Sequence, residues 1–149
     1  MIEVGQSEQQ IDSECDLHTY GLGPCVGIVV GHKSKVSMLH APMPDAGGAE
    51  DFFDDLCAAI PQHEQAAVRP VLAGALTNFG QMNRNLQNTR NWVESEIVRL
   101  GFGEPHIHWG DGGFFGGHSM TTSIEKGTVT IAYQDLEVES SIVAVAPLW

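Results

Sequence analysis

CVGIVVGHKSKVSMLH, residues 25–40, carries the strongest structural signal in this chain of 149 residues. It begins with a short apolar run suited to a buried strand, continues through a polar, turn-like segment at 31–35, and ends in a second apolar run. Two such runs joined by a short polar segment predict a β-hairpin. Similar patterns predict strands over residues 70–76, 105–109, 120–124, 128–133 and 141–146, with a glycine-rich loop over 110–117.

Helical spacing of apolar residues predicts two helices. The first ends at Pro61, and the second covers residues 83–100, with Gly101 directly after its end. Because strands outnumber helices and neighbouring strands connect as hairpins, we predict an α+β fold, a single-domain α/β sandwich of mixed sheets with two main helices. The polar, acidic residues 1–16 are expected to form an N-terminal leader with at most a short edge strand, before a single domain over 17–149.

Composition limits the classes of partner. The formal net charge of -12 opposes binding to phosphate backbones and anionic lipid surfaces, so we expect neither nucleic-acid binding nor membrane association. No apolar segment approaches the roughly 20 residues that span a bilayer, which predicts no membrane insertion. The three cysteines are an odd number without a C-x-x-C pair, a pattern typical of thiols in a reducing compartment. We therefore expect a cytoplasmic protein.

Cys25 and His40 are the candidate catalytic residues of the hairpin. Glycines precede Cys25, and the second apolar run ends at His40. If the hairpin closes through a tight turn centred between His32 and Lys33, Cys25 lies opposite His40. An adjacent imidazole favours the thiolate, which is the nucleophilic form of cysteine. Thr19 is a candidate third group that would orient the imidazole. The structural alternative is that Cys25 is a small core residue, as most cysteines in apolar strands are.

Several segments resemble one known family in order and spacing. Gly-Leu-Gly-Pro-Cys-Val at 21–26 resembles the Gly-Leu-Gly-Ser-Cys-Val signature of the CheD family of chemoreceptor glutamine deamidases. His-Ala-Pro-Met-Pro-Asp at 40–45 resembles that family's His-x-x-Leu-Pro-Asp segment, and the resemblance extends over most of residues 17–133. The other matching segments are Ala-Gly-Ala at 73–75, Asp-Gly-Gly-Phe-Phe-Gly at 111–116 and Lys-Gly at 126–127.

The resemblance implies a reaction and a set of residues. Cys25 would be the nucleophile, His40 the base and Thr19 the third member of a protein-glutamine deamidase that converts glutamine to glutamate on receptor signalling helices. Substrate contacts are implied at Gly21, Gly23 and Asp45. The resemblance also implies no cofactor, no metal, a chemotaxis phosphatase of the CheC type as partner, and a fold similar to that of bacterial deamidating toxins.

Two departures from the family pattern favour an alternative function. Pro24 replaces the serine before the cysteine and removes one backbone N–H beside the nucleophile, and His118 stands near the place where the family has Gly-Arg. A catalytically weak or inactive CheD-like module that binds a chemotaxis partner is therefore the second hypothesis. The third is a metal-dependent hydrolase built on His106, His108 and Asp111.

The acidic residues of the first predicted helix leave two readings open. They are either a solvated helix face or a docking surface for a basic partner protein. The group consists of Glu50, Asp51, Asp54 and Asp55.

Overall fold

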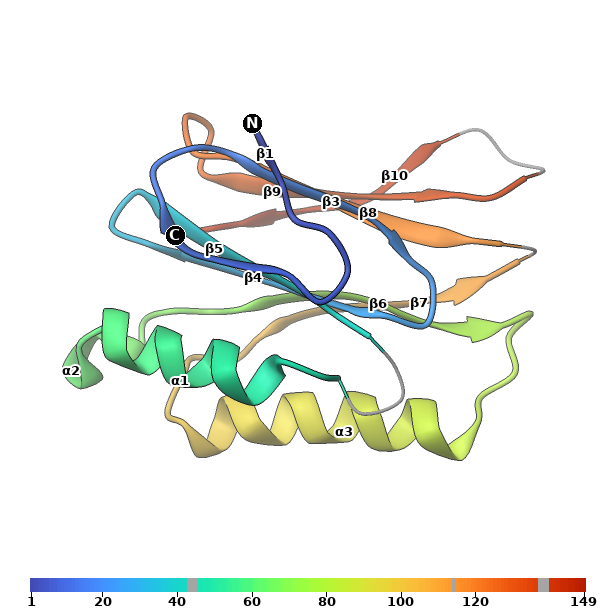
Figure 1. Cartoon of the computed structure of the whole chain (residues 1–149), viewed down its shortest axis with the longest axis horizontal. Helices are drawn as coiled ribbons and strands as arrows, with labels where there is room; N and C mark the ends of the chain where they lie inside the picture. The colour runs from blue at the N-terminus through green and yellow to red at the C-terminus, as the bar shows by residue number, and fades with distance from the viewer. Residues whose placement is uncertain (43–45, 114, 137–139) are drawn as a thin grey trace.

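Two β-sheets and a layer of helices are stacked on one another in the structure, a computed structural model that describes residues 1–42, 46–113, 115–136 and 140–149. In Figure 1 one sheet lies at the top, the second lies in the middle, and the helices cover the lower face of the second sheet. Within the described residues, each sheet has five strands and contains both parallel and antiparallel pairs. This arrangement confirms the predicted α+β sandwich.

The middle sheet contains the hairpin predicted from residues 25–40. Its strand order is β2-β5-β4-β6-β7, in which β6 and β7 run parallel and the other neighbours run antiparallel. Both faces of the central strand β4 are buried, since every residue of β4 except the last is buried. In order along the chain, the strands of this sheet are β2 (Gln9–Ser13), β4 (Val26–His32), β5 (Lys35–Ala41), β6 (Val71–Asn78) and β7 (His106–Gly112).

The outer sheet has the order β1-β3-β8-β9-β10, with a parallel β1–β3 pair and antiparallel pairs beyond it. The predicted glycine-rich loop at 110–117 is shorter than expected, because β7 extends to Gly112 and β8 begins at Gly117. The late hairpin turns near Gly127, whose φ of 67° favours glycine. The strands are β1 (Ile2–Glu3), β3 (Leu17–Leu22), β8 (Gly117–Ser123), β9 (Thr128–Gln134) and β10 (Ser141–Pro147).

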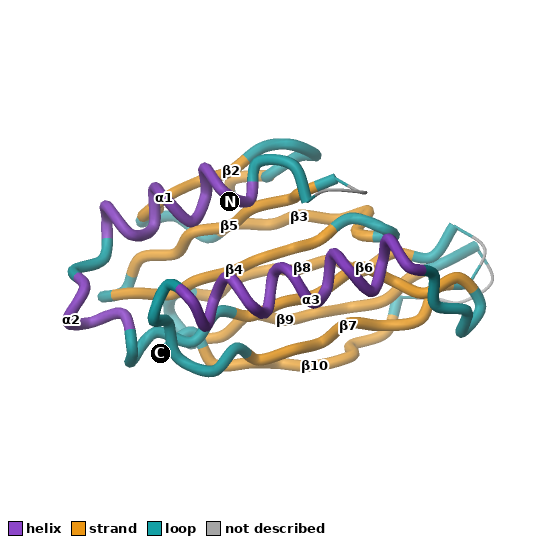
Figure 2. The backbone as a smooth tube through the Cα atoms, turned by 90° about the horizontal axis from the view of Figure 1, so that it is seen from below, coloured by secondary structure: helices purple, strands orange, loops and turns teal. Residues whose placement is uncertain are grey.

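The helices lie together on the outer face of the middle sheet (Figure 2). They are α1 (Ala49–Ala59), the short α2 (Gln62–Gln65) and α3 (Arg84–Arg99). The side chain of Asn83 caps α3 by accepting a 2.8 Å hydrogen bond from the Leu86 N–H, and Gly101 follows with a φ of 84°. None of the described helices combines the length and the apolar character that crossing a bilayer requires.

Alternation along the hairpin divides the interior into two cores. Val26, Ile28 and Val30 pack with the helices, whereas Cys25 and Val29 belong to the core between the two sheets. Successive strand residues point to opposite faces, so this division places every second hairpin residue in the inter-sheet layer. The candidate residues of the hairpin therefore face the outer sheet.

The polar N-terminal segment is more structured than the expected leader. It contains two edge strands, β1 in the outer sheet and β2 in the middle sheet. Val4 is fully buried between them, and the backbone N–H of Ser7 donates to the carbonyl oxygen of His40 at 2.8 Å. Residues 1–16 are thus part of the folded domain and support one of the candidate residues.

The predicted register of the central hairpin is wrong by two residues. The pairing is His32↔Lys35 and Gly27↔His40, so the turn is formed by Lys33 and Ser34. Both turn residues have positive φ, 49° and 62°, as a two-residue turn matching the twist of the strands requires. Neither is the glycine or asparagine that usually marks such a turn, so the local sequence gives no clear signal for its position.

Candidate functional site

Thr19 of β3 and His40 of β5 meet between the two sheets. The Thr19 Oγ1 and His40 Nδ1 atoms are 2.8 Å apart, and both side chains are buried. Thr19 Oγ1 also donates to the carbonyl oxygen of Val4 at 2.7 Å. Because a hydroxyl has one proton, which this carbonyl receives, the His40 Nδ1 must donate to Thr19. The pair is therefore a directed chain from imidazole to hydroxyl to backbone carbonyl.

This hydrogen bond determines the tautomer of His40. With the proton on Nδ1, the Nε2 atom carries a lone pair and can act as a base. Within the described part of the chain no group hydrogen-bonds this Nε2, although it is buried and the residue is only 4% exposed. Burial also lowers the pKa of His40, which favours the neutral, basic imidazole at neutral pH. A buried, neutral imidazole whose Nε2 carries a lone pair can receive a proton at that atom.

Cys25 lies on the same face of the middle sheet as His40. It directly precedes β4, its side chain belongs to the inter-sheet core, and it is 8% exposed. A register error of two residues preserves the face, so Cys25 and His40 are diagonal neighbours rather than directly opposed. Diagonal neighbours across an antiparallel pair have Cα atoms about 7–8 Å apart, within reach of a thiol and an imidazole that turn toward each other.

Gly27 explains why a side chain of the outer sheet reaches His40. It stands directly opposite His40 in the hairpin. A Cβ at this position would lie 2.6 Å from Met120 Sδ and 2.7 Å from a methyl carbon of Leu22. The absent side chain therefore lets the two sheets approach closely, and Thr19 comes within hydrogen-bonding distance of the imidazole.

The backbone on either side of Pro24 is held by β6. The Ala75 N–H donates to the Cys25 carbonyl oxygen at 2.7 Å, and the Leu76 N–H donates to the Gly23 carbonyl oxygen at 2.8 Å. Pro24 has no N–H of its own. The turn that presents Cys25 is thus tied to the adjacent strand by two main-chain hydrogen bonds.

The three implied substrate-binding residues lie in different parts of the chain. Gly21 is exposed, has a φ of 71°, and lines a groove of about 270 Å³ on the outer sheet together with Tyr20 and Phe115. Gly23 is partly buried in the turn before Cys25. Asp45 lies outside the described residues. Gly21 therefore lies near the end of β3 and lines this groove, whereas Gly23 lies in the turn between β3 and Cys25.

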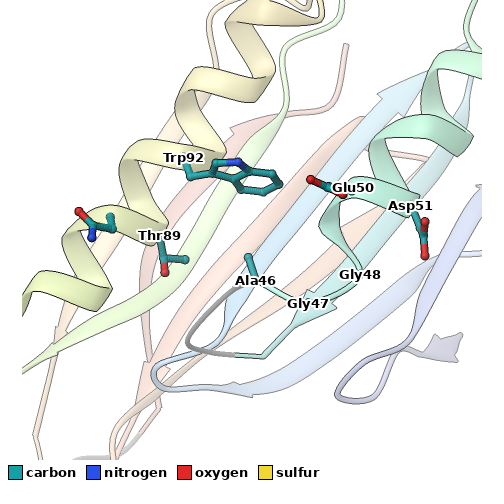
Figure 3. Close-up of a pocket in the computed structure, with 8 residues that line it drawn as sticks. Ala46, Gly47, Gly48, Glu50, Asp51, Thr89 and Trp92 are labelled. Carbon is teal, nitrogen blue, oxygen red and sulfur yellow. The ribbon is translucent and has the colours of Figure 1, made fainter.

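A larger cleft of about 520 Å³ lies between α1 and α3. Figure 3 shows Glu50 of α1 and Trp92 of α3 pointing toward each other across it. It is on the helix side of the middle sheet, opposite the face that carries Cys25 and His40. The acidic helix face thus borders this cleft through Glu50 and Asp51, separate from the candidate site.

The hypothesis of a metal site on β7 gains no support from the geometry. Among the residues that the structure describes, no group of three or more His, Cys, Asp or Glu side chains is placed to hold a metal ion. Asp111 instead accepts a hydrogen bond from the hydroxyl of Thr77. His106 and His108 lie in an edge strand without a third ligand from this group.

Two contacts near the Cys25 turn were not predicted from the sequence, one of them made by His118, which had been noted only as a departure from the family pattern. His118 of β8 is 2% exposed, and its Nδ1 accepts a 3.0 Å hydrogen bond from the Gly74 N–H. Arg90 of α3 donates to the carbonyl oxygen of Ala75. Nothing in the local sequence indicated either contact, because each joins segments that are distant along the chain.

Comparison with known proteins finds no family model and no curated protein that matches the chain. The class of site is therefore defined by its geometry. It consists of a cysteine, a histidine with a fixed tautomer and a threonine that orients it, placed between two sheets of an α+β sandwich.

Stability is expected to fall as the pH is lowered from about 6.5 toward 4. Burial lowers the pKa of His40, and burial followed by the charge of His108 lowers the pKa of His118 from 6.5 to about 4. A histidine with a depressed pKa binds fewer protons in the folded chain than in the unfolded chain, so its stabilising contribution is lost across this range as the pH falls. Urea unfolding between pH 7 and 4 measures the effect.

The His118→Asn variant is the matched comparison for this pH dependence. Asparagine retains an acceptor for the Gly74 N–H but has no titrating group. We expect a shallower loss of stability for the variant than for the wild-type chain. Equal slopes in the two proteins would contradict the assignment of the loss to His118.

Proposed function

We propose that the chain is a cysteine-dependent protein-glutamine deamidase of the CheD type, acting in the cytoplasm on glutamine side chains of chemoreceptor signalling helices. The observation that carries the proposal is the Thr19–His40 hydrogen bond, which leaves a buried Nε2 lone pair on the face that Cys25 shares. A neutral histidine beside a thiol is the arrangement that activates a cysteine nucleophile.

The proposed reaction proceeds through a thioester. His40 Nε2 accepts the thiol proton, and the Cys25 sulfur attacks the glutamine amide carbon to form a tetrahedral oxyanion. Collapse breaks the C–N bond, and the imidazolium gives its proton to the departing ammonia. His40 then takes a proton from a water molecule, which attacks the thioester and releases glutamate and the thiol. Because Pro24 has no N–H, oxyanion stabilisation must come from the Cys25 N–H or from a group farther away.

Thr19 keeps the base in its useful form through both steps. The imidazole is protonated and deprotonated at Nε2, while Nδ1 continues to donate to Thr19 Oγ1. The Val4 carbonyl in turn holds the threonine hydroxyl in this direction. The N-terminal segment thus contributes to the proposed mechanism through a backbone atom.

The burial of Cys25 favours a long, slender substrate side chain. Only 8% of the residue is exposed, so a reacting amide must reach past the surface atoms to meet the sulfur. Glutamine is unbranched and one methylene longer than asparagine, which suits it to a recessed nucleophile. We therefore expect a preference for glutamine over asparagine.

The same low exposure supports the second candidate function. A binding module of this fold would keep the cysteine as a core residue and regulate a partner such as a CheC-type phosphatase through its surface. The two main-chain hydrogen bonds from β6 hold the Cys25 turn in place, as a purely structural cysteine would also require. This candidate predicts partner binding without chemical change in the partner.

The deciding experiment incubates the wild-type chain with a soluble receptor signalling domain that contains glutamines. We expect released ammonia in equal amount to the glutamates found by peptide mass spectrometry, increasing with time at substoichiometric enzyme. A receptor domain that binds the chain while all its glutamines persist, even with enzyme in excess, would support the binding module and contradict the deamidase.

A further inference from the structure

β6 is kinked where it passes the Cys25 turn. Gly74 and Ala75 both have positive φ, 81° and 46°, and the pairing of β6 with β7 shifts between Gly74 and Thr77. Positive φ is unfavourable for a residue with a side chain such as Ala75, so surrounding contacts must hold the conformation. The kink directs the Ala75 N–H to the carbonyl oxygen of Cys25. The placement of the turn therefore depends on the kink.

His118 holds the kink from the outer sheet. Its Nδ1 accepts the Gly74 N–H at 3.0 Å, a group that the irregular strand would otherwise leave without a ladder partner. The pKa of His118 is lowered to about 4 by burial and by His108, so the imidazole is neutral at pH 7 and Nδ1 can accept. Gly110 lies against the same ring, since a Cβ there would be 2.8 Å from its Cε1 atom.

Arg90 holds the kink from the helix layer. Its Nε and one terminal nitrogen donate to the Ala75 carbonyl oxygen at 3.1 and 2.6 Å, and that terminal nitrogen also donates to the Gly110 carbonyl oxygen at 3.0 Å. The guanidinium carbon lies 5.8 Å from the ring centre of Trp109. A rigid, charged fork that is partly buried fixes a backbone carbonyl more firmly than a neutral donor would.

We propose that His118 and Arg90 are positioning residues, which hold the Gly74–Ala75 kink from opposite sides of the middle sheet and thereby orient the Cys25 turn. In this proposal both residues act through the backbone of β6 and not on the reacting atoms. His118 fixes the N–H of Gly74, Arg90 fixes the C=O of Ala75, and the Ala75 N–H between them holds the Cys25 carbonyl. The role in catalysis rests on the proposed deamidase function, whereas the effect on the Cys25 thiol does not.

The test measures the alkylation rate of Cys25 by iodoacetamide from pH 6 to 10, with peptide mass spectrometry separating it from Cys15 and Cys57. In His118→Leu and Arg90→Met we expect an altered pH profile and a rate at pH 7 that differs about tenfold from wild type, as a change of about one unit in the thiol pKa would cause. For the deamidase, a misplaced nucleophile should lower kcat about 10- to 100-fold with little change in KM. Thermal unfolding of each variant verifies that it is folded.

Two variants act as controls. His118→Asn keeps an acceptor for the Gly74 N–H and should restore a near-wild-type profile. Arg99→Met removes an exposed arginine of the same helix, which pairs with Glu96, and should leave the Cys25 profile unchanged.

The outcomes separate the two proposals. A wild-type Cys25 profile in folded Arg90→Met or folded His118→Leu overturns the positioning role. If His118→Leu does not fold, the Arg90→Met profile decides. If neither variant folds, the His118→Asn profile decides: a profile unlike wild type overturns the positioning role, and a wild-type profile supports it. Altered profiles in variants of a chain that releases no ammonia would sustain the positioning role while the deamidase proposal fails.

Discussion

Replacing Cys25 by serine is expected to reduce deamidation by at least ~10³-fold, because removing the nucleophile from a group of residues that act together eliminates most of the chemical rate enhancement. A hydroxyl is far less acidic than a thiol, so much less of the nucleophilic anion forms beside His40. The change is small in volume, so the folded structure should persist. Steady-state ammonia release from a receptor signalling domain measures the loss.

The matched controls for this prediction are the other two cysteines. Cys15 is exposed and Cys57 is half-buried in α1, so serine at either position should leave the rate close to wild type. The His40→Gln variant should lose activity about 10²–10⁴-fold, because the general base is missing. Full activity in both Cys25→Ser and His40→Gln would show that the mechanism is wrong.

The Gly74→Ala variant is expected to lose about 3–5 kcal/mol of unfolding free energy, among the larger effects of single substitutions. A Cβ at Gly74 would overlap the carbonyl oxygen of Cys25 and come within 3.0 Å of the Leu22 Cβ atom. The first of these atoms belongs to the backbone of the Cys25 turn, so the overlap is relieved only by moving that turn or β6. Urea unfolding and the Cys25 alkylation rate report the two consequences.

Gly101→Ala is the matched control for the strain of positive φ. Gly101 has a φ of 84°, close to the 81° of Gly74, but nothing lies within 4 Å of the point that a Cβ would occupy there. It should lose about 1–2 kcal/mol from the backbone conformation alone. Equal losses in the two variants would contradict the argument that close approach to Cys25 makes Gly74 necessary.

Local sequence patterns were sufficient to predict the central hairpin and the long helix α3. The apolar runs at 25–30 and 36–40 predicted the hairpin, and helical spacing over residues 83–100 predicted α3 to within one residue at each end. These signals are local, because a buried strand or an amphipathic helix must repeat apolar residues at its own period. The N-terminal strands were underestimated because β1 and β2 are polar edge strands, which bury little apolar surface of their own.

The candidate site was partly accessible from the sequence. The face shared by Cys25 and His40 was predicted correctly although the register was wrong, because an error of two residues leaves the alternation of faces unchanged. Thr19 was a candidate because a third group must orient the imidazole, the family resemblance implied the same residue, and its contact with His40 is consistent with both. The Val4 carbonyl that directs the threonine hydroxyl was not foreseen, since a backbone atom leaves no mark in a sequence.

The sequence was sufficient for the main strands and the two long helices, for the fold class and for the face on which Cys25 and His40 lie, since each follows from periodicity within a short segment. Only the tertiary structure decided the tautomer of His40 and the support of the Cys25 turn. Those features depend on Thr19 of another sheet, on His118 and on Arg90 of a helix. Hydrogen bonds between such distant segments depend on how the layers stack, which no local pattern encodes.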